Sequence, residues 1–289
     1  GSRSTFHSSM NYSIEEYAND IVYNIMDVCD DEKVPHPHIV SESGRAIVAH
    51  HSVLVVQAFG AIEKTPLAPR VIQAADHKLV RELLETDQAL TEERINESWH
   101  DLIQIKEQAQ TMFELGLLDL DVKARVESLF WQVAERIQGL VERMDPAEVP
   151  EDVKNLKIEL ADQHICNFSV FQSLLDHWAL GQLFPIVPIH RLNERPQFES
   201  TLVDITCDSD GKVSKYIDLN DVRETLPLHE IRNDQPYYLG IFLVGAYQET
   251  LGDIHNLFGD TDTANVSLNA LGGYSIERQR KGDTTDVML

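Results

Sequence analysis

The spacing of apolar residues predicts a helix near the start of the chain. Ser13 is followed three residues later by Glu16, which is a capping-box pattern. Apolar residues then fall at helical spacing from Ile14 to Val28. We predict a helix that ends at about Asp30.

The next segment has the order of helical and strand-like patterns that is typical of an α/β fold. After two prolines, residues 38–40 are strand-like and lead into the polar loop 41–45. Residues 46–59 are apolar and predict a buried helix, or a strand and a helix. This order places functional groups at the carboxyl end of a strand.

A helical block follows from about residue 66 to residue 150, where Leu, Glu, Gln, Arg and Ala dominate. Apolar residues between Val122 and Met144 form one continuous helical stripe, and helices are also expected around 76–90 and 91–115. The stripe favours a packed core over a cofactor site.

The remainder of the chain is of mixed character to residue 180 and then mostly β. Glycine-, Asp- and Asn-containing turns separate short apolar runs, which is typical of strands. The expected strands cover residues 183–187, 201–207, 213–218, 238–246 and 264–270. A helix is expected at 248–258.

Charge and cysteine content narrow the class of protein. The formal charge of −24 would repel a nucleic acid backbone and would attract a cationic small molecule, although high negative charge commonly serves solubility alone. Three widely spaced cysteines predict a reducing, cytoplasmic location without disulfides. No apolar run reaches membrane-spanning length, so we expect no membrane partner. The first residues lack a start methionine and a secretion signal, and we expect them to lie within a longer sequence.

Two polar clusters near the N-terminus could bind ligands. Glu42 and Arg45 flank Gly44 just after the predicted strand at 38–40, a pattern that suits an anion or cofactor but also suits a solvated turn. The histidines lack the i,i+4 spacing of a helical zinc site, so a metal set is not favoured. These are His36, His38, His50 and His51.

Cys207 stands in an acidic turn. Period-two alternation through the predicted strand places it on the face opposite Asp204, and Asp208 and Asp210 follow. Neighbouring carboxylates disfavour a thiolate, so this pattern indicates a proton donor rather than a nucleophile. A plain Asp-rich hairpin turn is the alternative.

Tyr247 ends the apolar run 240–247 and precedes the predicted helix. Its hydroxyl could bind a phosphate near the helix N-terminus. It could equally be a packed tyrosine.

Several motifs, taken in order, resemble a known family. ESGR at 42–45, CDSDG at 207–211 and GAY at 245–247 resemble the second half of pyridoxal-phosphate-dependent basic amino-acid decarboxylases of the alanine-racemase-like type. The longer stretches ESGRAIVAHH, NFSVFQS, QLFPIVP, DITCDSDG and VGAYQETLGDIHNLFGDT, with the helical block, are similar to biosynthetic arginine decarboxylases.

The resemblance implies an α/β plus β fold. It comprises a partial pyridoxal-phosphate-binding β/α barrel with a helical-bundle insertion, followed by a C-terminal β domain. We expect late barrel strands and helices in 1–62, the insertion in 63–150, a return to the barrel and a crossover in 151–190, and the β-rich domain in 191–289.

The resemblance also implies cofactor ligands. Glu42 matches the acid that pairs with the pyridine nitrogen of pyridoxal 5′-phosphate, although many relatives have proline where Ser43 stands. Arg45 and Tyr247 match two phosphate ligands. Magnesium is expected from the family, with its site unknown.

Three further residues match groups near the substrate. Cys207 matches the proton donor to the α-carbon and Asp208 the carboxylate that meets the distal cation of L-arginine, both reaching into a partner subunit. His255 is expected to line the pocket. The resemblance therefore implies a homodimer or higher oligomer with shared active sites.

None of the ten lysines lies in the context of the family's Schiff-base lysine. We therefore expect that catalysis requires a lysine-bearing N-terminal segment or chain, and that this chain alone is inactive. Two alternatives stay open: a decarboxylase of ornithine, lysine or diaminopimelate, and a catalytically inactive partner that regulates a decarboxylase.

Overall fold

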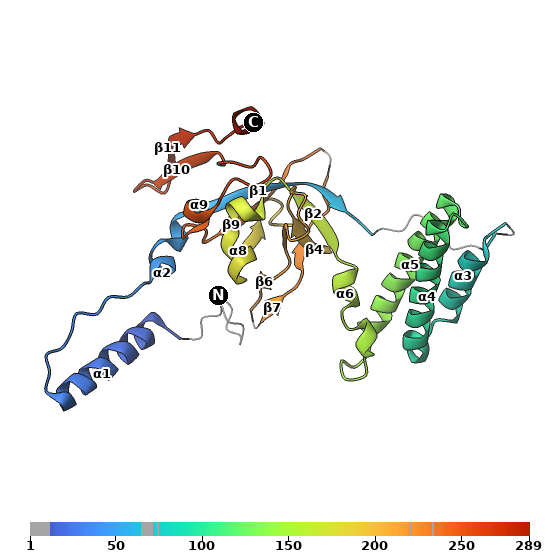
Figure 1. Ribbon diagram of the computed structural model, residues 1–289, viewed down its shortest axis with the longest axis horizontal. Helices are drawn as coiled ribbons and strands as arrows, with labels where there is room; N and C mark the ends of the chain where they lie inside the picture. Colours follow the sequence, from blue (N-terminus) through green and yellow to red (C-terminus); the bar gives the residue numbers. More distant parts are fainter. Residues whose placement is uncertain (1–11, 65–71, 74, 220, 233) are drawn as a thin grey trace. The chain divides into compact units, whose positions relative to one another are not determined.

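A computed structural model describes residues 12–64, 72–73, 75–219, 221–232 and 234–289 (Figure 1). The chain divides into two compact units. The first unit contains the described residues up to Ala61 together with 164–197 and 201–289, and the second contains 62–163 and 198–200. The predicted boundaries at residues 62, 150 and 190 stay predictions.

The second unit is a helical bundle, as predicted. Helices α3, α4 and α5 pack against one another, and their apolar stripes form one core around Leu83, Leu102 and Leu129 (Figure 1). The stripe on α5 is therefore core, as the spacing of its residues indicated. The helices are α3 (Lys78–Ala89), α4 (Ile95–Glu114), α5 (Leu120–Val141) and α6 (Leu156–Glu159), with 3-10 turns at Glu92–Arg94 and Glu151–Val153.

Two ion pairs tie α5 to the start and end of α3. Arg125 pairs with the carboxylate of Asp76, just before α3. Near the end of α3, the guanidinium of Arg136 lies 2.8 Å from Asp87, whose side chain is nearly buried. Both carboxylates keep a cationic partner, as burial requires.

The first unit is built on a seven-stranded sheet with the order β3-β9-β1-β2-β4-β5, in which β8 also pairs with β4. Strand β1 runs antiparallel to β9, from the pair Val53 and Phe242 to the pair Ala58 and Tyr237. The strands are β1 (Val53–Ile62), β2 (Asp162–Cys166), β3 (Ile186–Pro188), β4 (Phe198–Val203), β5 (Lys212–Val213), β8 (Leu226–Leu228) and β9 (Tyr237–Phe242). Buried side chains of these strands form a second apolar core.

Shorter elements complete the first unit. Helices α7, α8 and α9 contact one another. The helices are α1 (Ile14–Glu32), α2 (Gly44–Val48), α7 (Val170–Ser173), α8 (Leu175–Leu180), α9 (Gln248–Leu251) and α10 (Thr285–Met288), with a 3-10 turn at Ala49–His51. Two small sheets pair β6 (Tyr216–Ile217) with β7 (Val222–Arg223) and β10 (Thr263–Leu268) with β11 (Tyr274–Arg280).

Helix α1 confirms the predicted N-cap. The Ser13 hydroxyl accepts a hydrogen bond from the Glu16 backbone at 3.1 Å, and the Glu16 carboxylate accepts one from the Ser13 backbone at 2.6 Å. The short strand expected at 38–40 is wrong, because residues 34–43 have no regular secondary structure. Residues 46–59 form the end of α2, a 3-10 turn and most of β1, so both a helix and a strand are present.

The expected strand 201–207 ends at Val203. The Asp204 side chain is buried and its Oδ2 accepts a hydrogen bond from the backbone of Val170 at 2.9 Å, which turns the chain away from the sheet. The alternation predicted through Cys207 is therefore wrong beyond Val203. Residues 213–218 are divided between β5 and β6, and the expected strand 238–246 ends at Phe242.

The expected helix 248–258 is also shorter than predicted. It ends at Leu251 because the next residue, Gly252, packs directly on the backbone of α7. A Cβ at this position would lie 2.0 Å from the carbonyl oxygen of Gln172. In the ranges that the structure describes, no helix is both long and apolar enough to cross a membrane.

Candidate functional site

Arg45 is held by a buried carboxylate. Its Nη2 donates to Asp176 Oδ2 at 2.7 Å, and Asp176 lies in α8 with only 4% of its surface exposed. The Arg45 side chain itself is about half-exposed. A guanidinium has five N–H groups, so this contact leaves donors for an anion.

Gln248 fixes the same carboxylate to α9. Its Nε2 donates to Asp176 Oδ2 at 2.8 Å, and its Oε1 accepts from the Asp176 backbone at 3.1 Å. The Nε2 also donates to the carbonyl of Ala246 at 2.9 Å. The start of α9 is thereby joined to α8 beside Arg45.

Tyr247 lies against Arg45. The guanidinium carbon is 4.8 Å from the centre of the tyrosine ring, a cation–π contact. A Cβ on Gly44 would lie 2.6 Å from the tyrosine hydroxyl, so glycine permits this close approach. Tyr247 has φ of 70°, a left-handed conformation that is costly for a bulky residue and is concentrated at functional sites.

Glu42 is exposed in the segment that precedes α2. The structure thus brings Arg45 and Tyr247 into contact and leaves Glu42 exposed, and the roles of all three residues stay predictions.

The Cys207 turn is anchored through Asp204. Asp204 Oδ1 accepts hydrogen bonds from the Thr206 backbone at 2.9 Å and from its hydroxyl at 2.7 Å. Cys207 and Asp208 are both exposed. The Cys207 thiol and the Asp208 carboxylate therefore face solvent on a turn that the hydrogen bonds of Asp204 hold in place.

Cys207 contrasts with the other two cysteines, which are buried. Burial raises the pKa of the Cys166 thiol to about 12, so this group stays protonated and unreactive. Accessibility alone makes Cys207 the cysteine that can meet a substrate.

Residues beyond α9 contact the Cys207 turn. Asn256 Nδ2 donates to Cys207 Sγ at 3.3 Å, and the adjacent His255 stacks on Phe171 of α7 at 4.3 Å between ring centres. His255 Nε2 is buried without a hydrogen-bond partner. Asn256 and Leu257 both have positive φ, so this segment is strained beside the thiol.

The predicted site residues thus form two groups within one chain. Arg45 and Tyr247 are in contact, and Cys207 contacts the residue next to His255. Among the described residues, no hydrogen bond or ion pair joins Cys207 or Asp208 to Arg45 or Tyr247.

Sequence reasoning missed three residues of these groups: Asp176, Gln248 and Asn256. Gln248 and Asn256 lie inside the motif VGAYQETLGDIHNLFGDT and could have been found there. Asp176 lies in no motif, and only its burial identifies it.

The first group fits a phosphate. A guanidinium with unused donors beside a phenolic hydroxyl is a suitable anion site. Among the described residues, no cluster of three or more His, Cys, Asp or Glu side chains could hold a metal ion.

Comparison with known proteins agrees with the fold. Residues 73–157 match the family model of the arginine decarboxylase helical bundle domain. The structure is similar to the crystal structure of the biosynthetic arginine decarboxylase SpeA from Campylobacter jejuni, with a TM-score of 0.76 and 33% identity over 96% of this chain and 44% of that one.

Curated sequences agree as well. The whole chain is 45% identical to the biosynthetic arginine decarboxylase of Thermosynechococcus vestitus, covering 45% of that protein. It is 47% identical to that of Deinococcus radiodurans, covering 44% of it. The chain spans a little under half the length of these relatives.

The sheet, the helical bundle and the C-terminal strands resemble the fold of pyridoxal-phosphate-dependent decarboxylases, which confirms the predicted fold class. Over its whole length, the chain is similar in sequence to biosynthetic arginine decarboxylases.

Proposed function

We propose that this chain is part of a pyridoxal-phosphate-dependent arginine decarboxylase that converts L-arginine to agmatine and CO2. The observation that carries the proposal is the contact of Arg45 with both Asp176 and Tyr247, at positions that match the family's phosphate ligands. The similarity of the whole chain to named arginine decarboxylases supports the choice of substrate.

Three residues would hold the cofactor. Arg45 and Tyr247 would bind its phosphate through N–H and O–H groups, and Glu42 would pair with the pyridine nitrogen and keep it protonated. When bound, pyridoxal phosphate supplies an electron-accepting ring that takes up the electron pair of the broken Cα–carboxyl bond.

Three further residues would act on the substrate. Cys207 would return a proton to the α-carbon, and Asp208 would bind the guanidinium through two hydrogen bonds. Both would do so in the site of a partner subunit, in a homodimer or higher oligomer. His255, with its unpartnered Nε2, would line the pocket.

The proposal includes a lysine from outside these residues. A lysine-bearing N-terminal segment or chain would supply the amine that binds the cofactor, so the 289-residue chain alone would be inactive. Magnesium, a cytoplasmic location and a role in polyamine biosynthesis are proposed from the family resemblance.

The test is a decarboxylation assay of the full-length gene product with L-arginine labelled in the carboxyl carbon. We expect labelled CO2 and agmatine in equal amounts, and much slower release from ornithine, lysine and diaminopimelate. Release from one of these three in preference to arginine would refute the substrate, and release from none of the four would refute decarboxylation.

A second assay distinguishes two hypotheses: that the chain is part of a decarboxylase, and that it regulates one. The 289-residue chain is mixed with an intact arginine decarboxylase whose activity is already maximal. No change in rate is expected, whereas saturable inhibition would favour the regulatory alternative.

A further inference from the structure

A second polar site lies in the first unit, where β9 begins at Tyr237. A cavity of about 220 Å³ is lined by six residues from two segments: His190, Arg191, Arg232, Gln235, Pro236 and Tyr237. Tyr237 in its wall precedes Tyr247 by ten residues in the sequence. None of the predicted cofactor or substrate ligands lines this cavity.

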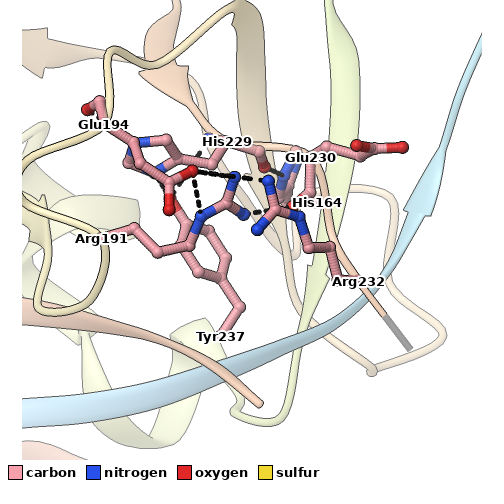
Figure 2. Close-up of polar contacts among 7 residues, drawn as sticks. All are labelled: His164, Arg191, Glu194, His229, Glu230, Arg232 and Tyr237. Carbon is pink, nitrogen blue, oxygen red and sulfur yellow. Dashed lines mark hydrogen bonds and ion pairs between the residues drawn. The ribbon is translucent and has the colours of Figure 1, made fainter. Parts of the chain in front are cut away.

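Two guanidinium groups share one carboxylate here. Arg191 Nε and Nη2 donate to Glu194 Oε2 at 2.8 and 2.7 Å, and Arg232 Nη2 lies 3.4 Å from the same oxygen. In Figure 2 the two guanidinium groups lie side by side, while the carboxylate of Glu230 points away from them. The three side chains in contact, Arg191, Arg232 and Glu194, therefore carry one net positive charge, and the more distant Glu230 carboxylate still attracts Arg191 electrostatically.

The arginine positions are fixed by the surrounding backbone. Arg191 Nη1 donates to the Glu230 carbonyl at 2.8 Å, and the backbone of Gln235 donates to the Arg232 carbonyl at 3.3 Å. His229 supports the same wall: its Nε2 donates to the Glu194 carbonyl at 3.0 Å, and its Nδ1 lies 2.8 Å from Tyr237 Oη (Figure 2). Arg232 is about half-exposed, so most of its donors are available to a ligand.

The wall of the cavity has two further features. The ring of His190 stacks on Tyr238 at 5.2 Å between ring centres, and its buried Nε2 has no hydrogen-bond partner and no surface open to the cavity. Arg191 has φ of 54°, a strained conformation for a long side chain and one that functional sites retain.

We propose that this cavity is a binding site for a phosphate group, either inorganic phosphate or the phosphate of a monoester. Arg191 and Arg232 supply the positive charge, and paired guanidinium groups match the oxygens of a phosphate. A phosphate fits within the volume of the cavity. The two guanidinium charges exceed the single negative charge of Glu194 in contact with them, and the half-exposed Arg232 has donors left for the phosphate.

The experiment is equilibrium dialysis of the full-length protein, saturated with pyridoxal phosphate, against radiolabelled inorganic phosphate at constant ionic strength. Saturation with the cofactor keeps free phosphate out of the Arg45 and Tyr247 site. We expect saturable binding of one phosphate per chain. Unlabelled glycerol 3-phosphate and unlabelled inorganic phosphate are then compared as competitors of the labelled phosphate. Displacement by glycerol 3-phosphate at the lower concentration would identify a monoester as the better ligand.

Arg232→Gln is the decisive variant because Arg232 is exposed and, among the described residues, its side chain makes only the long contact with Glu194. We expect at least a tenfold loss of phosphate affinity, as for loss of a charged hydrogen bond. Arg232→Lys keeps the charge and should lose less. The matched control is Arg94→Gln, which breaks an exposed arginine pair with Glu97 in the second unit and should bind phosphate as the wild type does.

Two results would overturn the proposal. One is wild-type phosphate affinity in Arg232→Gln. The other is the absence of saturable binding to the wild-type protein at about 10 mM phosphate, a concentration at which only a very weak site stays empty.

Discussion

Arg45 and Asp176 lie 131 residues apart in the chain and form an ion pair of 2.7 Å at the start of α2. The Asp176 carboxylate is buried and the Arg45 guanidinium is half-exposed, so the carboxylate holds the guanidinium in place. Gln248 in turn holds the carboxylate, because it donates a hydrogen bond to the same oxygen. This geometry makes Asp176 a positioning residue for the proposed phosphate ligand.

Asp176→Asn tests that role. The amide keeps the shape of the side chain but removes the charge that holds Arg45, so pyridoxal phosphate should bind the full-length protein about tenfold more weakly, as for loss of a charged hydrogen bond. The measurement is a spectroscopic titration of the apoprotein with the cofactor, and a normal kcat at saturating cofactor would mark a positioning role.

The control is Asp87→Asn, a buried aspartate that pairs with Arg136 in the helical bundle. It should lower stability without changing cofactor affinity. Equal effects of the two variants on cofactor affinity would show that Asp176 acts only through general stability.

Cys207→Ala tests the proton donor. Without the thiol, protonation at the α-carbon should fail, so the full-length enzyme should form agmatine more slowly and form more transamination product. Asp208→Ala is the neighbouring comparison, and it should mainly raise the KM for arginine because it removes the proposed partner of the guanidinium. Product analysis by mass spectrometry checks both, and an unchanged product ratio in Cys207→Ala would exclude its role.

Tyr216→Phe tests the pairing of β4 with β5, the two strands that flank the Cys207 turn. The buried hydroxyl accepts from the Leu202 backbone at 2.9 Å and donates to the carbonyl of Val213, which joins β4 to β5 on both sides of the turn. Burial raises the pKa of Tyr216, so the hydroxyl stays a neutral donor. Loss of the hydroxyl removes two buried hydrogen bonds to the backbone and should lower the free energy of unfolding by about 1–3 kcal/mol.

Urea denaturation provides the measurement for Tyr216→Phe. The control is Tyr274→Phe on the exposed face of β11, which should change the free energy of unfolding by less than about 0.5 kcal/mol. Similar values for the two variants would contradict the importance of the buried hydroxyl.

Stability should fall as the pH falls below about 6.5, the ordinary pKa of histidine. His164 Nε2 lies 3.2 Å from the His229 carbonyl and its Nδ1 is buried without a partner, and burial lowers the pKa of His164. Burial also lowers the pKa of His177. Because the unfolded chain binds these protons more readily, the stabilisation is complete above the unfolded pKa and is lost as pH falls toward the folded value.

His164→Gln checks this pH dependence. The glutamine amide can still donate to the His229 carbonyl but does not titrate, so the fall in stability between about pH 7.5 and 5.5 should be smaller than in the wild type. His177 remains and keeps part of the slope. Urea denaturation at each pH gives the comparison, and an unchanged slope in His164→Gln would exclude His164 as a source.

Local patterns predicted the long helices well. The capping box of α1 and the apolar stripe of α5 depend on residues three or four apart, so the sequence displays them directly. The Arg45 and Tyr247 contact was anticipated only through the family resemblance, because no local pattern relates residues 202 positions apart.

Long-range contacts explain the errors. The strand expected at 201–207 ends early because Asp204 bonds to Val170, which is 34 residues away. Helix α9 is short because Gly252 meets the backbone of α7. Asp176 went unnoticed for the same reason, since its importance depends on partners in two distant segments.

The most direct test of the account is the affinity of pyridoxal phosphate for the full-length protein and its Arg45→Gln variant, measured by titration of the apoprotein. We predict that Arg45→Gln weakens binding of the phosphorylated cofactor at least tenfold while leaving the weaker binding of pyridoxal, which lacks the phosphate, unchanged. Equal affinity of the wild type and Arg45→Gln for pyridoxal phosphate would contradict the assignment of this site.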